Sequence, residues 1–154
     1  MGRMAGLKDR LRADLTAAMK ARDEVRIRTL RMALTSIANE EVAGKQARDL
    51  GDDEVLRLLT REAKRRREAA DAFEGAGRRD QAAAERAEDA VLADYLPAQL
   101  SDAELASLVA DVIAETGAEG IASVGQVMKA VTPRVAGRAE GGRVAAQVRA
   151  TLAR

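Results

Sequence analysis

Side chains able to carry out covalent chemistry are scarce in this sequence. Its 154 residues include no Cys and no His, which removes the thiolate nucleophile, the usual general base and the commonest metal ligand. The four serines are Ser36, Ser101, Ser107 and Ser123, and none lies in a Gly/Ser-rich stretch that could place a base beside a nucleophile. No Gly-rich phosphate loop is present either. We therefore predict no catalytic residue, no metal site and no cofactor.

Two pairs of adjacent carboxylates are the remaining candidates for acid–base chemistry. They are Glu40-Glu41 and Asp52-Asp53. Adjacent side chains on a helix point about 100° apart, so the members of each pair diverge. We interpret all four as solvated surface, with Asp52 and Asp53 placed where a helix N-terminus favours negative charge.

Basic residues are concentrated toward the C-terminal end. Residues 120–154 hold six basic residues and one acidic residue, a net charge of +5, whereas residues 96–116 hold four acids and no base. Such a segment attracts phosphates and releases their counterions. The candidate RNA-binding residues are Lys129, Arg134, Arg138, Arg143 and Arg149. Without an aromatic side chain in this segment, contact with helical RNA through shape and phosphates is favoured over base stacking; an ordinary solvated surface is the alternative.

A second basic run, residues 64–67, points around the circumference of a helix and is offset by flanking acids. We interpret it as solvated surface, except for Arg66, which falls on an otherwise apolar helix face together with Glu62. Their spacing of one turn predicts a partly sheltered ion pair that crosses a helix seam. A polar contact with a ligand or partner is the alternative.

Composition indicates that helices position these groups. Strong helix formers dominate the sequence, and it contains only two prolines and two aromatic residues. Large apolar residues recur at spacings of three and four, which is typical of amphipathic helices. We predict an all-α fold of about seven short helices. The expected helices span about 6–21, 23–43, 52–74, 79–95, 101–117, 123–135 and 143–152.

The expected apolar faces follow from the same spacing. In the first helix the predicted face is Leu7, Leu11, Leu15 and Met19. In the fourth helix it is Ala83, Ala87, Val91 and Tyr95.

Several local signals mark the helix ends. Asp23 is suited to cap the second helix, and Ser101 with Glu104 forms a capping box before the fifth. Ser123 with Gln126 has the same pattern before the sixth helix. Two further signals are Gly117, which suits a helix C-terminus, and Pro133, which predicts a kink or an early end.

Pro97 marks the clearest boundary, because proline cannot continue the preceding helix. We therefore expect two parts. Residues 1–95 form an N-terminal helical domain of four helices, and residues 96–154 form a C-terminal domain of three.

Taken together, several blocks resemble the YqeY family over nearly the whole chain. The blocks are Arg31-Met32 with Asn39-Glu40, residues 61–66, Tyr95-Leu96-Pro97 with Gln99-Leu100-Ser101, and Gly125 to Lys129 followed by Pro133 and Gly137-Arg138-Ala139. The C-terminal blocks are also similar to the tail domain of GatB, a subunit of the tRNA-dependent amidotransferase. The resemblance implies an N-terminal helical domain followed by a smaller helical one. It also implies a connection to tRNA, which that tail domain contacts while catalysis takes place elsewhere in the complex.

The leading functional hypothesis is a non-catalytic, tRNA-associated binding protein that uses its C-terminal part to contact RNA. The main alternative is a helical adaptor that docks on an amidotransferase or another translation factor. An accessory role in glutamine-dependent carbon–nitrogen ligation is the third option, and it would need a catalytic residue that the sequence does not offer. No apolar run approaches the roughly 20 residues of a membrane span, and Met1 to Ala5 lack the apolar stretch of a signal peptide. We therefore expect a cytoplasmic protein.

Overall fold

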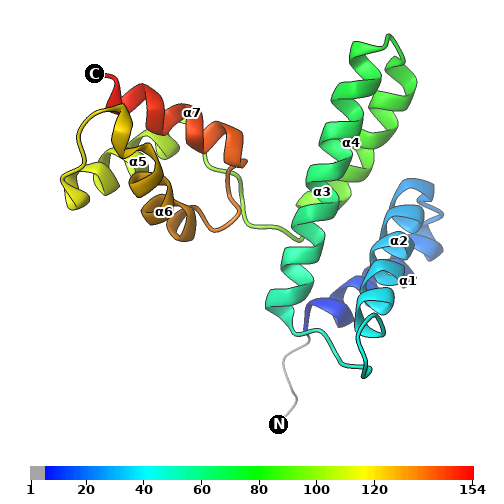
Figure 1. Cartoon of the computed structure of the whole chain (residues 1–154). Helices are drawn as coiled ribbons and strands as arrows, with labels where there is room; N and C mark the ends of the chain where they lie inside the picture. The colour runs from blue at the N-terminus through cyan, green and yellow to red at the C-terminus, as the bar shows by residue number, and fades with distance from the viewer. Residues whose placement is uncertain (1–5) are drawn as a thin grey trace. The chain divides into compact units, whose positions relative to one another are not determined.

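A computed structural model describes residues 6–154. These residues form seven α-helices and one short 3-10 helix, with no strand among them (Figure 1), so the predicted all-α class is confirmed. The elements are α1 (Leu7–Ala21), α2 (Glu24–Glu41), α3 (Asp52–Gly75), α4 (Arg79–Ala93), α5 (Asp102–Thr116), η1 (Ile121–Ser123), α6 (Val124–Val135) and α7 (Gly141–Leu152).

The chain divides into two compact units, each with its own hydrophobic core. Unit 1 is Met1–Leu96 and unit 2 is Pro97–Arg154. The division falls at Pro97, where the missing backbone N–H and the fixed φ stop a helix from continuing.

Unit 1 consists of two helical hairpins, α1–α2 and α3–α4 (Figure 1). Their facing stripes meet in one core, in which Leu11, Leu30, Leu59 and Leu92 are at most 1% exposed. The turn end of the α3–α4 hairpin extends beyond α1 and α2 in Figure 1. Apolar burial against α1 and α2 therefore involves mainly the first half of α3.

Two expected apolar faces are each wrong at one position. In α1, Met19 is 48% exposed and Ala18 is buried in its place. In α4, Ala83 is exposed and Ala82 is buried. Ala is compatible with either side of a helix, so an Ala-rich stretch specifies its rotation poorly and the packing partner decides.

The starts of the helices in unit 1 are stabilised in two ways. Asp23 caps α2 as predicted, because its carboxylate accepts from the Arg26 N–H at 3.2 Å. The first residue of α1 instead donates to another helix: Leu7 N–H reaches Asp52 Oδ1 at 2.9 Å. The preceding Gly6 has no side chain to do this, so Asp52 ties the start of α3 to the start of α1.

Glu41, at the end of α2, anchors the loop 42–51. Its carboxylate accepts from Lys8 Nζ at 2.6 Å and from Leu50 N–H at 2.9 Å, and its carbonyl accepts from Arg48 N–H at 2.9 Å. The hydrogen bond to Lys8 lowers the pKa of Glu41 and raises the pKa of Lys8. The interpretation of Glu41 as solvated surface is therefore wrong: its side chain is 17% exposed and fixes the loop.

Unit 2 is a three-helix arrangement of α5, α6 and α7 around a valine-rich core. Val109, Val127, Val131 and Val148 are fully buried in it. The capping box at the start of α5 is confirmed, with Ser101 Oγ accepting from Glu104 N–H and Glu104 accepting from Ser101 N–H.

The entry to α6 differs from the prediction. Ser123 makes no capping hydrogen bond to α6; its hydroxyl donates to Glu119 O at 2.9 Å and closes the η1 turn. Ser123 is the last residue of η1 and has a φ of −89° and a ψ of 3°. A capping serine needs an extended backbone instead. At the other end, α6 continues past Pro133, which lies inside its last turn, and ends at Val135, the residue expected from the sequence.

Within residues 6–154, no helix combines the length and the apolar character needed to cross a bilayer. Met1 to Ala5, on which the expectation about a signal peptide rests, lie outside the described residues.

Candidate nucleic-acid interface

Arg138 follows the C-terminal end of α6 and hydrogen-bonds to it. Its Nε donates to Val135 O at 3.1 Å and its Nη2 donates to Arg134 O at 2.9 Å. These carbonyls belong to the last turn, which lacks intrahelical partners, and a cation is favoured there by the helix dipole. Ala136 and Gly137 reverse the chain with φ of 49° and 78°. Arg138 therefore stabilises the reversal after α6.

Arg143 joins the start of α7 to the segment that enters unit 2. Its Nη2 donates to Leu100 O at 3.0 Å and to Asp102 Oδ1 at 2.8 Å. On the other side of the same residue, Leu100 N–H donates to Arg138 O at 2.7 Å. The structure thus brings Arg138 and Arg143 together around the Leu100 backbone, where the Gln99-Leu100-Ser101 block meets the Gly137-Arg138-Ala139 block.

The other three RNA-binding candidates lie on helix surfaces. Arg134 pairs with Glu115 of α5 at 2.8 Å. Lys129 on α6 and Arg149 on α7 are exposed, and neither has a polar partner among residues 6–154. Of the five candidates, only these two present an uncompensated charge to solvent.

The charge of unit 2 is segregated but balanced. Residues 97–154 contain six acids and six bases. All six bases follow residue 128, and five of the six acids precede residue 120. The Arg134–Glu115 and Arg143–Asp102 ion pairs connect the two halves. The +5 segment therefore does not leave unit 2 with a net positive charge.

Arg66 is buried in unit 1, as its place on the apolar face of α3 predicted, but its expected partner is wrong. The guanidinium donates to Glu88 of α4 and lies 3.6 Å from Glu85. Glu62 pairs loosely with Arg65 instead, at 3.7 Å. The α3–α4 hairpin brings Glu88 opposite Arg66 across 22 residues of sequence, a relation that helix spacing within α3 cannot reveal.

Arg28 of α2 completes this cluster. Its Nε donates to the second oxygen of Glu88 at 2.7 Å, so one carboxylate with a 9% exposed side chain holds two arginines. The Arg66 Nη2 also lies 3.7 Å from the sulfur of Met32 on α2. The cluster joins α2, α3 and α4. Its arginines are paired with its own glutamates.

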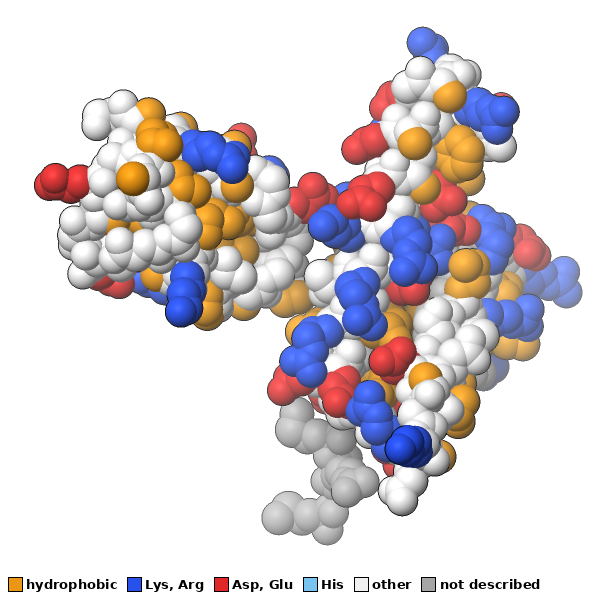
Figure 2. All heavy atoms as spheres, in the orientation of Figure 1, with side chains coloured by type: hydrophobic (Ala, Val, Ile, Leu, Met, Phe, Trp, Pro, Cys, Tyr) orange, Lys and Arg blue, Asp and Glu red, His pale blue; other side chains and the backbone are white. Residues whose placement is uncertain are grey.

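A second group of cations lies along the first half of α3, and the sequence analysis did not identify it as a candidate site. Figure 2 shows Lys and Arg side chains gathered over this part of unit 1. Arg57, Arg61 and Arg65 recur every four residues, which places them on one face of the helix, and all three are exposed. Among the described residues, Arg57 and Arg61 have no hydrogen-bond or ion-pair partner.

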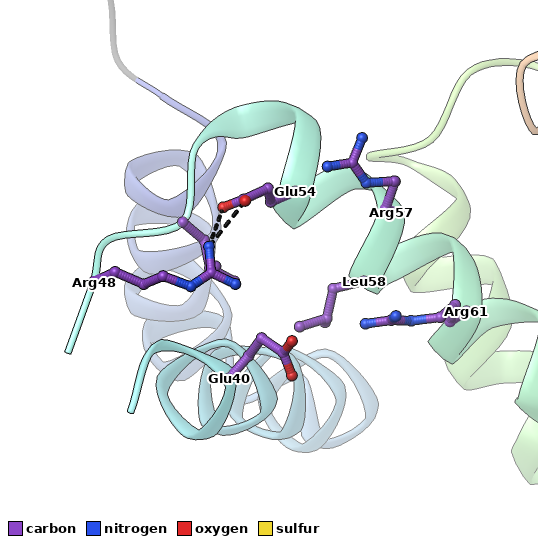
Figure 3. Close-up of a pocket in the computed structure, with 7 residues that line it drawn as sticks. Glu40, Arg48, Glu54, Arg57, Leu58 and Arg61 are labelled. Atoms are coloured by element: carbon purple, nitrogen blue, oxygen red, sulfur yellow. Dashed lines mark hydrogen bonds and ion pairs between the residues drawn. The ribbon is translucent and has the colours of Figure 1, made fainter. Parts of the chain in front are cut away.

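This face of α3 borders a pocket with a volume of about 120 Å³. The pocket is lined by Glu40, Arg48, Leu50, Glu54, Arg57, Leu58 and Arg61. Figure 3 shows Glu40 and Arg61 directed toward the pocket from opposite sides, with Leu58 between them and Arg57 above. Two blocks of the YqeY resemblance, Asn39-Glu40 and residues 61–66, thus contribute to one site.

Arg48 and Glu54 form the closed side of this pocket. The Arg48 Nη1 lies 2.9 Å from both carboxylate oxygens of Glu54, and this contact lowers the pKa of Glu54 (Figure 3). The ionised Glu54 compensates Arg48. The i, i+4 spacing of Arg57 and Arg61 was visible in the sequence, but Glu40 and the loop residues reach the pocket only through the packing of α2 on α3.

Among residues 6–154, no group of three or more acidic, Cys or His side chains is arranged to hold a metal ion.

Comparison with models of known protein families gives a match over residues 8–152 to the YqeY model, described as Yqey-like protein. No curated protein matches the chain.

Proposed function

Since the chain belongs to the YqeY family, we propose that it is a non-catalytic RNA-binding protein that contacts tRNA through the exposed cations of unit 2. The observation that carries this proposal is the pair of uncompensated charges on adjoining helices, Lys129 on α6 and Arg149 on α7. Phosphates contacted by such side chains release counterions, which favours binding at low salt.

The remaining basic candidates have a supporting role in this proposal. Arg138 and Arg143 fix the turn 136–140 and the first turn of α7 by binding protein oxygens. Arg134 is compensated by Glu115 but is 43% exposed at its side chain, so a phosphate can compete for it. Recognition is by shape and phosphate, because residues 97–154 contain no aromatic side chain for stacking.

The test is the salt dependence of tRNA binding by the full chain. Reversal of both charges in the Lys129→Glu/Arg149→Glu variant should weaken binding and reduce the slope of log K against log salt by about two. Both positions are exposed and unpaired, so the helical spectrum should not change. A matched control is Lys20→Glu/Lys45→Glu, which reverses two exposed and unpaired cations of unit 1 and should keep the wild-type slope.

Two results would overturn the proposal: wild-type protein without salt-sensitive affinity for tRNA, or a Lys129→Glu/Arg149→Glu variant that binds as well as wild type. Docking on a translation factor through apolar helix faces would then be the better explanation, since such docking depends only weakly on salt.

A further inference from the structure

The pocket between α2, the loop 42–51 and α3 has features that the RNA-binding proposal for unit 2 does not use. Two of its side chains, Arg57 and Arg61, carry guanidinium groups without a partner among the described residues. Elsewhere in unit 1, arginines near acids are paired, as in Arg66–Glu88, Arg67–Asp89 and Arg86–Glu74. Arg78 and Arg79 are a second unpaired couple, but the pocket beside them is lined by residues 77–81 alone. The pocket beside Arg57 and Arg61 is bounded by a second helix and a loop as well.

The charges around the pocket favour an anion. Glu54 is held by Arg48 and its pKa is lowered by that hydrogen bond, so these two charges cancel. Glu40 is the one unpaired carboxylate of the lining and lies opposite Arg61. The nearby charge of Arg57 also lowers the pKa of Glu54. The lining as a whole carries three arginines and two carboxylates, which leaves a net positive charge.

The wall of the pocket is fixed before any ligand binds. The loop 42–51 is held by the hydrogen bonds from Leu50 N–H and Arg48 N–H to Glu41, and Leu50 is buried. Arg48 is further restrained by Glu54. A fixed wall reduces the ordering cost of binding, because only the Arg57 and Arg61 side chains need to settle.

The size and donor geometry identify the group that fits. A volume of about 120 Å³ accommodates one small group, well below the several hundred Å³ typical of sites for larger ligands. A planar carboxylate is satisfied by a single guanidinium fork, whereas a tetrahedral phosphate offers oxygens to two forks at once. Arg57 and Arg61, one helical turn apart, both line the cavity from α3. In Figure 3 Arg61 points into the cavity and the Arg57 guanidinium lies above it, so a phosphate between them requires Arg57 to turn toward Arg61.

We propose that this pocket binds one phosphate group, with Arg57 and Arg61 as its ligands and Arg48 as part of its wall. The phosphate belongs to a nucleic-acid backbone or to a small phosphate ester, and the two sources are separated by the test below. The site lies in unit 1 and is independent of Lys129 and Arg149.

The experiment titrates the full-length, isotopically labelled chain with inorganic phosphate, at constant ionic strength maintained with chloride, and follows backbone amide NMR signals. Saturable shifts are expected around Glu40, Arg48, Arg57 and Arg61. The Arg57→Gln/Arg61→Gln variant should bind phosphate at least tenfold more weakly. Glu40→Gln should bind it more tightly, because it removes the opposing negative charge.

A matched control removes two other unpaired arginines, at the turn end of the α3–α4 hairpin. Arg78→Gln/Arg79→Gln changes the net charge by the same amount but lies about 20 Å further along the hairpin, and it should leave the phosphate shifts at wild-type values. Equal weakening in the control, unchanged binding in Arg57→Gln/Arg61→Gln, or weaker binding in Glu40→Gln would overturn the proposal.

Competition then identifies the source of the phosphate. Displacement of inorganic phosphate by a short RNA duplex, at equal ionic strength, would assign the site to a nucleic-acid backbone. Displacement by glycerol phosphate and not by the duplex would assign it to a small ester; both results support the pocket. Both arms are repeated with Lys129→Glu/Arg149→Glu, in which the phosphate shifts should persist even where tRNA binding fails, so failure of one proposal is distinguishable from failure of the other.

Discussion

Arg66 of α3 and Glu88 of α4 form a buried ion pair, and the second oxygen of the same carboxylate accepts from Arg28 of α2. The side chains of both members of the pair are 9% exposed. Through Arg28, the pair thus connects the two hairpins of unit 1. Arg66 Nε is buried without a hydrogen-bond partner. An unsatisfied buried donor lowers the free energy of unfolding.

Removing one member of this pair should destabilise unit 1 more than removing both. Glu88→Ala leaves the Arg66 charge buried with only Glu85 at 3.6 Å, and it should lower the free energy of unfolding by about 3 kcal/mol. Arg66→Met/Glu88→Leu replaces the pair with apolar side chains of similar volume and should lie within about 1.5 kcal/mol of wild type. Urea unfolding measures both. Arg86→Ala is the control, because its exposed ion pairs with Asp71 and Glu74 should contribute at most about 1 kcal/mol. A double variant less stable than Glu88→Ala would contradict this account.

Two serines with the same sequence pattern should respond differently to replacement by Ala. Ser101→Ala removes a capping box that the structure contains and should cost about 1 kcal/mol. Ser123→Ala removes only a hydrogen bond from the hydroxyl to Glu119 O within the η1 turn, and it should change stability by less than about 0.5 kcal/mol. Thermal unfolding followed by circular dichroism compares the two variants. Equal losses would mean that Ser123 caps α6 in solution.

Replacing the basic candidates of unit 2 should affect the stability of the fold at some positions and not at others. Arg143→Ala loses hydrogen bonds to Leu100 O and Asp102, and each such bond contributes about 1 kcal/mol. It should therefore increase amide hydrogen exchange in the first turn of α7 several-fold. Lys129→Ala and Arg149→Ala remove exposed, unpaired side chains and should leave exchange rates unchanged. Faster exchange in the last two variants would show that these side chains have a structural role.

Stability should fall in acid because of Glu41 and in base because of Lys8. The folded-state pKa of Glu41 is lowered from 4.5 by the Lys8 hydrogen bond, so its contribution is complete above that value and is lost as the pH falls through the folded-state pKa. The folded-state pKa of Lys8 is raised from 10.5, so the same contact is complete below that value and is lost as the pH rises through the raised pKa. The melting temperature should be level from about pH 5 to pH 10, and both decreases should be smaller in Lys8→Met/Glu41→Leu. Unchanged decreases would exclude this pair as their source.

The sequence by itself determined the elements of this protein. Seven helices follow from apolar spacing, and α2 and α5 start at Asp23 and Ser101 because a cap involves groups within three residues of each other. Gly117 ends α5 with a φ of 68°, which glycine adopts without steric cost. Each of these signals acts over one turn of chain, so neighbouring residues are sufficient to read it.

Only the tertiary structure decided which charged groups meet. Glu88 as the partner of Arg66, the Leu100 backbone between Arg138 and Arg143, and Glu40 opposite Arg61 all join residues from separate elements. These relations depend on the rotation of each helix about its own axis and on its position along the axis of the helix packed against it. Ala-rich stripes such as the one on α4 specify rotation weakly, because a methyl group packs on almost any face, and the larger side chains of the facing helix therefore determine which residues become buried and which charges find each other.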